Sequence, residues 1–377
     1  MRYLRSEDQE FFRATTARFL TELVPPAELR ARRDDPTGFD LDYWRRGAEL
    51  GWTSLLVDEA HGGGSISDAG LVDLSVIAYE FGAHAAPGPL GPGNVVAAAL
   101  SAAGSHLEVL AAVMSGTSIA AWCDGCESPD PTSVSSVNVR RERDEIVISG
   151  TVRPVESAAA ADYLLVAGRS GEGVTQVIVP MDTPGVALTP MSSVDLTRRF
   201  SLVRFDDVRL PTSAVVGQYG AAGEALLWQR RVAIVVAAAE SVGTMQTAFD
   251  MTVEWAFDRY SFGRPLASYQ ALKHRFADMK TWLEASHAIA DSAAAAMSSV
   301  DPNAAELVHA AMAFIGHYGS ELVQDCVQMH GGLGVTFEHD VHLYLRRHTL
   351  NRTLWGGPTV HRQMITDLVE ARELVGA

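Results

Sequence analysis

The fold of this chain is decided by the stretch Arg259-Tyr-Ser-Phe-Gly-Arg-Pro-Leu-Ala-Ser-Tyr-Gln-Ala-Leu-Lys-His-Arg-Phe-Ala-Asp-Met-Lys280. Before it, apolar residues recur at spacings of three and four, as on one face of a helix: Val242, Met245, Phe249, Val253 and Ala256. Gly263 and Pro265 interrupt this pattern. The same spacing then resumes with Tyr269, Leu272, Phe276 and Met279. The sequence therefore predicts two long helices joined by a turn, with Arg259 at the end of the first.

Two further blocks accompany this stretch. One is glycine-rich, Val327-Gln-Met-His-Gly-Gly-Leu-Gly-Val-Thr336, and the other is Phe205-Asp-Asp-Val-Arg-Leu-Pro211. The glycine-rich block does not follow a predicted strand, so it is not the dinucleotide-binding turn of a βαβ unit. An arginine at a helix end, such as Arg259, suits bidentate contact with a phosphate. The later arginines are compatible with a phosphate-binding patch or with a solvated helix face: Arg346, Arg347 and Arg352.

Composition excludes several classes of protein. A chain of 377 residues has room for two or three domains with a sizeable core. Its formal net charge of −16 argues against binding to nucleic acid. Three cysteines, an odd number, indicate no disulfide framework and suit a reducing cytoplasm. The first residues lack the apolar segment of a signal peptide, and no uncharged apolar run reaches the roughly 20 residues that span a membrane.

The periodicity of the chain changes twice. Residues 1–116 have helical spacing, and Ser6 with Gln9 forms a predicted capping box at the start. Residues 117–215 contain short β-rich segments separated by turn residues, which predicts a small antiparallel β domain. Helical spacing returns over residues 216–377. This order of helices, strands and helices predicts an α+β protein and argues against a doubly wound sheet.

Segment 259–280 resembles the signature of the acyl-CoA dehydrogenase family, Arg-x-x-Phe-Gly-x-Pro followed by Tyr-Gln, His and Ala-Asp-Met. The other two blocks resemble family motifs and occur in the family's order. The resemblance implies an N-terminal helical domain, a middle antiparallel β-barrel domain and a C-terminal four-helix bundle. It also implies dimers or tetramers, of like or unlike subunits, with FAD at the subunit interfaces.

The resemblance assigns one group of residues to the nucleotide part of FAD. Arg259 reaches the pyrophosphate, and Phe262 packs near the adenosine side. Gln270 contacts the nucleotide from the partner subunit. The glycine-rich block offers backbone amides to the FAD of a neighbouring subunit, and its matching residues are Gln328, Gly331 and Gly332.

The flavin ring is expected near Trp122 and Cys123, which match the family's aromatic-Cys-x-Thr-Glu-Pro turn. Gly125 and Cys126 stand where the family has Thr and Glu, and segment 150–157 lacks the tryptophan of the family's next flavin contact. These departures imply that FAD is held differently, or in only one half of a mixed assembly. The two cysteines have no second Cys or His pair at zinc spacing, so we expect no metal site.

The catalytic base is missing from both of its usual positions. Dehydrogenation removes the α proton of the thioester while the β hydride passes to flavin, so a desolvated carboxylate must lie against the α carbon. This chain has Gly356 at one family position and Ala233 at the other. Glu240 lies about two helical turns beyond Ala233 on the same helix face. It is either the base or a carboxylate that is salt-bridged between packed helices.

Three hypotheses on function follow. The first is FAD-dependent oxidation of an acyl-CoA to its 2,3-enoyl product, with electron-transfer flavoprotein or a similar protein as acceptor. The alanine-rich, glutamate-poor pattern also resembles actinobacterial members built from two unlike subunits, which act on bulky, steroid-like acyl-CoAs. The second hypothesis is therefore a non-catalytic partner subunit that completes an FAD site. The third is a family member of secondary metabolism that acts on acyl-carrier-protein thioesters or on other substrates.

Overall fold

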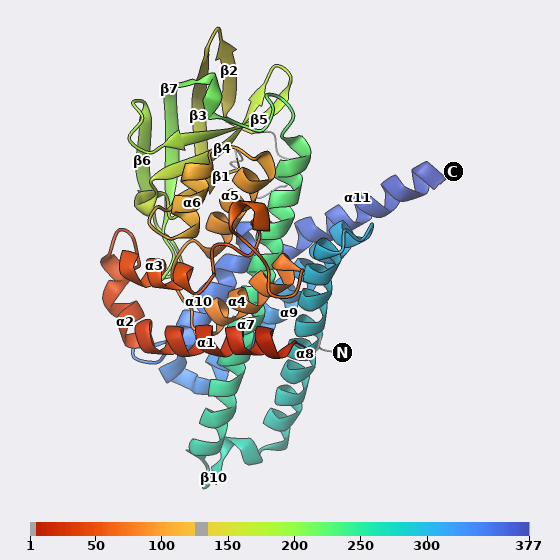
Figure 1. Ribbon diagram of the computed structural model, residues 1–377. Coiled ribbons are helices and arrows are strands. Elements are labelled where there is room, and N and C mark those ends of the chain that lie inside the picture. Colours follow the sequence, from red (N-terminus) through yellow and green to blue (C-terminus); the bar gives the residue numbers. More distant parts are fainter. Residues whose placement is uncertain (1–4, 125–134, 377) are drawn as a thin grey trace.

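The computed structural model describes residues 5–124 and 135–376. The capping box predicted at the start of the first helix is present, because the Gln9 amide donates to the Ser6 hydroxyl and the Ser6 amide donates to the Gln9 side chain. The N-terminal helices lie together beneath the sheet (Figure 1): α1 (Glu7–Leu23), α2 (Pro26–Ala31), α3 (Leu41–Glu49), α4 (Gly70–Ala83), α5 (Leu90–Ala103) and α6 (Leu107–Met114).

The described strands of the middle region form one mixed sheet, with hydrogen-bonded order β6-β7-β3-β2-β4-β5-β8 and β1 paired to β4. Most pairs are antiparallel, but β1 runs parallel to β4 and β2 meets β4 in parallel at one residue pair. Parallel partners need a long connection, and β2 and β3 lie between β1 and β4 in the chain. The strands are β1 (Ala120–Cys123), β2 (Asn138–Glu142), β3 (Glu145–Glu156), β4 (Tyr163–Ser170), β5 (Gly173–Pro180), β6 (Val186–Met191), β7 (Phe200–Pro211) and β8 (Val215–Val216).

The second helical region is α7 (Gly223–Asp258), α8 (Gln270–Ser298), α9 (Ala304–His330), α10 (Val341–Leu354) and α11 (Pro358–Gly376). The helix α7 packs on α4, α8, α9 and α10, and α9 packs on α11. The C-terminal part of α11 extends away from the rest of the protein (Figure 1).

One described helix, α7, has the length and hydropathy of a membrane span, but 89% of its apolar window is buried in the protein, so it is a core helix. The expected α+β class is confirmed, although the predicted antiparallel sheet is mixed.

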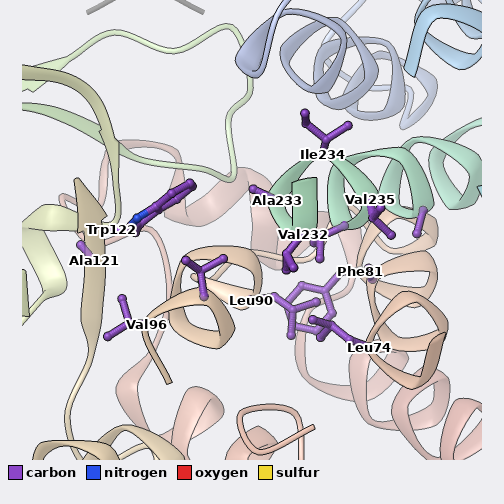
Figure 2. Close-up of a cluster of buried hydrophobic side chains, with 14 of the residues drawn as sticks. Leu74, Phe81, Leu90, Val96, Ala121, Trp122, Val232, Ala233, Ile234 and Val235 are labelled. Atoms are coloured by element: carbon purple, nitrogen blue, oxygen red, sulfur yellow. The ribbon is translucent and has the colours of Figure 1, made fainter. Parts of the chain in front are cut away.

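Two glycines let α4 and α7 approach closely. A Cβ atom on Gly82 would lie 1.8 Å from the Glu240 carbonyl oxygen, and one on Gly243 would lie 2.0 Å from the Tyr79 carbonyl oxygen. The Thr244 hydroxyl donates across this contact to the Gly82 carbonyl at 3.2 Å. Apolar side chains of α4, α5, β1 and α7 continue the contact as one buried cluster (Figure 2), so the two helical regions and the sheet share a core.

Candidate active site

The signature segment forms the turn between α7 and α8, at one end of the molecule (Figure 1). Here β9 (Tyr260–Ser261) pairs with β10 (Arg264–Pro265) in a two-stranded hairpin. At its tip Phe262 is 97% exposed and has a φ of +50°, a left-handed conformation that is a strained one for a bulky residue. Arg259 follows the last residue of α7, and its guanidinium lies 5.9 Å from the centre of the Trp255 ring. The hairpin thus presents a cation and an aromatic ring at the protein surface.

The glycine-rich turn lies beside this hairpin because Trp255 connects them. The indole nitrogen of Trp255 donates to the Met329 carbonyl at 3.2 Å, and its ring stacks on His330 with 5.3 Å between ring centres. Gly331 begins the 3-10 turn that follows α9 and has a φ of +61°. A Cβ atom at Gly331 or Gly332 would meet no neighbouring atom within 4 Å, so the backbone of this turn is open to a ligand.

The predicted nucleotide-binding residues are therefore accessible at the same end of the molecule. Gln328 is exposed on the last turn of α9, and Gln270 is exposed at the start of α8. The Gln270 amide lies 3.3 Å from the His274 ring. Accessible glycine backbone at the same end of the molecule as the Arg259 guanidinium suits an anionic pyrophosphate.

Trp122 and Cys123 lie at the other end of α7 and are buried at the end of β1. The Trp122 ring lies 5.4 Å from the Trp355 ring, at an interplanar angle of 34°. Its indole N–H has no hydrogen-bond partner in the described part of the chain. Burial raises the pKa of the Cys123 thiol, and the Asp124 carboxylate raises it further. Cys126 and Gly125, the other residues of the expected flavin turn, lie outside the described residues.

Glu240 is buried in a network of charges where the sheet meets the C-terminal helices. Its Oε2 accepts from Arg198 Nη1 and from Asn351 Nδ2, each at 3.2 Å. The same Arg198 guanidinium also donates to both carboxylate oxygens of Glu156, at the end of β3. Burial raises the pKa of Glu156 although Arg198 opposes the rise. These contacts correspond to the second of the two roles considered for Glu240, a salt-bridged carboxylate between packed elements.

Arg347 extends the network to the N-terminal helices. Its guanidinium donates to Asp195 and Thr197, in the segment between β6 and β7, and to the carbonyl oxygens of Ala85 and Ala86 at 3.1 and 2.9 Å. The side chain is fully buried, so it belongs neither to a phosphate-binding patch nor to a solvated helix face. Burial alone would raise the pKa of Asp195, but Arg347 and the Thr197 amide outweigh it and hold that pKa below its usual value.

The sequence did not predict this junction. Its members come from β3, from the segment before β7 and from α7 and α10, and no spacing relates them. One feature of the sequence could have indicated this junction: charged residues that stand on otherwise apolar helix faces. Glu240 stands among alanines and valines, and Arg347 follows the buried Leu343 and Tyr344. A charged side chain on a buried face needs a charged or hydrogen-bonding partner.

Comparison with known proteins agrees with this architecture. Residues 6–112 match the model of the acyl-CoA dehydrogenase N-terminal domain, and residues 221–369 match that of the C-terminal domain. The chain belongs to the acyl-CoA dehydrogenase family. Acyl-CoA dehydrogenase IpdE2 of Mycolicibacterium smegmatis is 29% identical over 354 residues, which are 94% of this chain and 96% of that protein.

Solved structures of acyl-CoA dehydrogenases also superimpose well. A variant of the steroid acyl-CoA dehydrogenase Tcur3481-Tcur3483 has a TM-score of 0.87 at 25% identity, over 98% of this chain and 99% of the other. The ChsE4-ChsE5 complex from Mycobacterium tuberculosis has a TM-score of 0.86 at 22% identity over the full length of both chains, which shows the fold alone. By its family, the chain is therefore a flavoprotein oxidoreductase.

The described residues can be compared with the two parts of the FAD that the family uses. The surface around Arg259 and the glycine-rich turn has the charge and open backbone that a dinucleotide needs. On the flavin side, Trp122 is packed against Trp355, and Glu156 of the segment that lacks the family's tryptophan is bound to Arg198. The flavin-side residues thus have partners within the chain, except that the buried Trp122 indole N–H has none in the described part.

Proposed function

We propose that this chain is one subunit of an FAD-dependent acyl-CoA dehydrogenase built from unlike subunits, and that its partner supplies the catalytic base. The observation that carries the proposal is that neither family position of the catalytic base holds a carboxylate in this chain. Gly356 and Ala233 have no side chain that can take a proton, and Glu240 is held by Arg198 and Asn351. A carboxylate that already accepts two hydrogen bonds in a buried network is suited to joining elements of the fold.

The reaction defines what each subunit contributes. Formation of the 2,3-enoyl product needs a base for the α proton of the acyl thioester, and FAD, when bound, would supply the acceptor for the β hydride. In our proposal, Arg259 and the backbone at Gly331 and Gly332 of this chain bind the nucleotide of an FAD shared with the partner. Trp355, whose ring packs on Trp122, immediately precedes Gly356, the residue at this chain's empty base position.

One structural neighbour supports unlike subunits and a bulky acyl group, because its title joins two names, Tcur3481-Tcur3483, and calls the protein a steroid acyl-CoA dehydrogenase. We therefore propose a bulky, ring-containing acyl-CoA as substrate and an electron-transfer flavoprotein as acceptor. We also propose a cytoplasmic location, where the buried thiols of Cys123 and Cys326 remain reduced.

Co-expression tests the proposal. The chain is purified alone and together with an unlike family member encoded beside it, and the visible absorbance of bound flavin is recorded before and after addition of an acyl-CoA. We expect a colourless protein alone and a yellow complex that holds one FAD for each pair of unlike chains and is bleached by substrate. A yellow homo-oligomer that acyl-CoA bleaches without any partner would instead support the homomeric enzyme with Glu240 as base.

A further inference from the structure

A cavity of about 470 Å³ lies between α1, α4, α7 and α8. Its floor is apolar and is formed by Val72 and Val76 of α4, Ala239 and Val242 of α7, and Ala294 of α8. In Figure 1 the N-terminal end of α1 reaches α8, where these helices meet. A volume of this size is typical of sites for small organic ligands. We propose that the cavity binds a compact, uncharged, mainly apolar ring compound that carries a hydroxyl or carbonyl group.

The cavity wall is held in place by one buried carboxylate. Asp73, which has no exposed surface, accepts hydrogen bonds from the Gln9 side chain, from the Ile66 amide and from the Ser67 hydroxyl, all at 2.7–2.8 Å. Gln9 in turn is part of the capping box of α1. These bonds connect α1 and the segment before α4 to α4 itself. The cavity is therefore preformed, which lowers the entropic cost of binding a ligand.

The side chains around the cavity indicate the chemistry of the ligand. The rings of Tyr79 and His287 line it, with 5.6 Å between their centres and an interplanar angle of 37°, and they offer aromatic edges and faces for contact with a ring compound. Ser298 lines it as well, and its buried hydroxyl oxygen has no hydrogen-bond partner in the described part of the chain. Two carboxylates and one guanidinium line the cavity, those of Asp68, Asp291 and Arg5, so an anion is disfavoured, and the apolar floor disfavours a cation. A neutral group that hydrogen-bonds to Ser298 fits best.

This cavity is separate from the candidate active site. It is lined from α7 by Ala239 and Val242, whereas Glu240 and Ala233 lie on another face of that helix, and Arg259 follows its far end. The site therefore does not depend on FAD, on a partner subunit or on the identity of the base. A ligand in the cavity would lie next to the turn of α7 that includes Glu240, and Glu240 belongs to the charge network.

Fluorescence with prodan tests the site, because prodan is a neutral naphthalene ketone whose emission shifts to shorter wavelength in apolar surroundings. The purified full-length chain is titrated in three forms: unchanged, Ala295→Phe and Ala288→Phe. Ala295 lines the cavity, whereas Ala288 is a half-buried alanine of the same helix outside it. We expect saturable binding that Ala295→Phe weakens at least about tenfold, and that Ala288→Phe leaves unchanged. Ser298→Ala is expected to weaken binding severalfold.

Circular dichroism melts show whether each variant is folded. Should Ala295→Phe not fold, Ala239→Leu fills the same cavity from α7 and replaces it in the comparison. Equal affinity in the unchanged and cavity-filled proteins would overturn the proposal. So would an equal loss in the cavity-filling and control variants, or an emission that rises without saturation.

Discussion

Arg198, between β6 and β7, lies 3.2 Å from Glu240 of α7, from Nη1 to Oε2. The other side of the same guanidinium binds Glu156 at the end of β3. One buried arginine thus joins the sheet to the central helix, while Arg347 ties the neighbouring Asp195 to the N-terminal helices. Three carboxylates share two guanidiniums here, and burial raises the pKa of Glu156. The arrangement of the three regions of the fold therefore depends on a charge network at their junction.

Replacing Arg347 with Met is expected to lower the free energy of unfolding by about 3–5 kcal/mol, because it leaves Asp195 buried without its cation. Urea denaturation monitored by circular dichroism measures the change. Arg346→Met is the matched control, since the Arg346 side chain is half-exposed and donates a hydrogen bond to the Val194 carbonyl at 3.1 Å. The control is expected to change stability by no more than about 0.5 kcal/mol. Equal losses in the two variants would show that the buried network contributes little.

Glu240→Gln separates the two roles of this carboxylate. We expect the substitution to cost about 1–3 kcal/mol of stability, because Arg198 and Asn351 lose a charged acceptor. In the co-expressed complex we expect flavin to remain bound and acyl-CoA to bleach it at close to the normal rate. Stopped-flow absorbance measures the bleaching. A variant that keeps its colour and its stability but is no longer bleached would identify Glu240 as the base.

Arg259→Ala is expected to weaken FAD binding by the co-expressed complex about tenfold to hundredfold, as for loss of a charge-assisted contact to a phosphate. The melting temperature of the flavin-free protein should not change, because the guanidinium lies on the surface. Arg264→Ala is the control from the same hairpin, where the guanidinium lies 3.9 Å from the Tyr269 ring centre. Equilibrium dialysis of FAD gives both affinities. If the two variants bind FAD as tightly as the unchanged complex, the signature segment has another role.

The stability of the protein is expected to depend on pH through His309 and His361, whose Nδ1 atoms lie 3.0 Å apart between α9 and α11. Burial lowers the pKa of each to about 4. The unfolded chain, with histidine pKa near 6.5, binds more protons than the folded one between these values. Stability is thus fully present above about pH 6.5 and falls as the pH is lowered toward 4, by up to ~1.4 kcal/mol per unit for each histidine.

Melting temperatures between pH 4 and 7 measure this effect. His361→Phe should reduce the slope of stability against pH, because one of the histidines with a lowered pKa is removed. His317→Phe, at an exposed position of α9, should leave the slope as it is. An unchanged slope in His361→Phe would mean that other groups control the acid side of the stability curve.

Gly243→Ala is expected to cost about 1–3 kcal/mol, because its Cβ atom would lie 2.0 Å from the Tyr79 carbonyl and would force α4 away from α7. Gly223→Ala, at the start of the same helix, is the control, since its Cβ atom would meet no neighbour within 4 Å. Thermal melts followed by circular dichroism compare the two. Similar melting temperatures would show that α4 moves aside at little cost.

Much of the fold follows from local pattern. The apolar spacing from Val242 to Ala256 predicts the second half of α7, and the glycine and proline at 263 and 265 predict the turn that follows. The short β-rich segments predict strands, but their spacing holds no information on partners. The parallel pairing of β1 with β4 was missed for this reason, because strand direction in a sheet depends on how distant segments meet.

By itself the sequence determined the order of helices and strands, the family and the two base positions that lack a carboxylate. Only the tertiary structure decided which charged residues are buried together. Arg346 and Arg347 are adjacent arginines, yet the Arg346 side chain is half-exposed and the Arg347 side chain is fully buried. The physical reason is that a charged side chain is buried only where it has partners, here Asp195 and Glu240. These partners belong to distant elements, so the residue spacing around Arg347 does not reveal them.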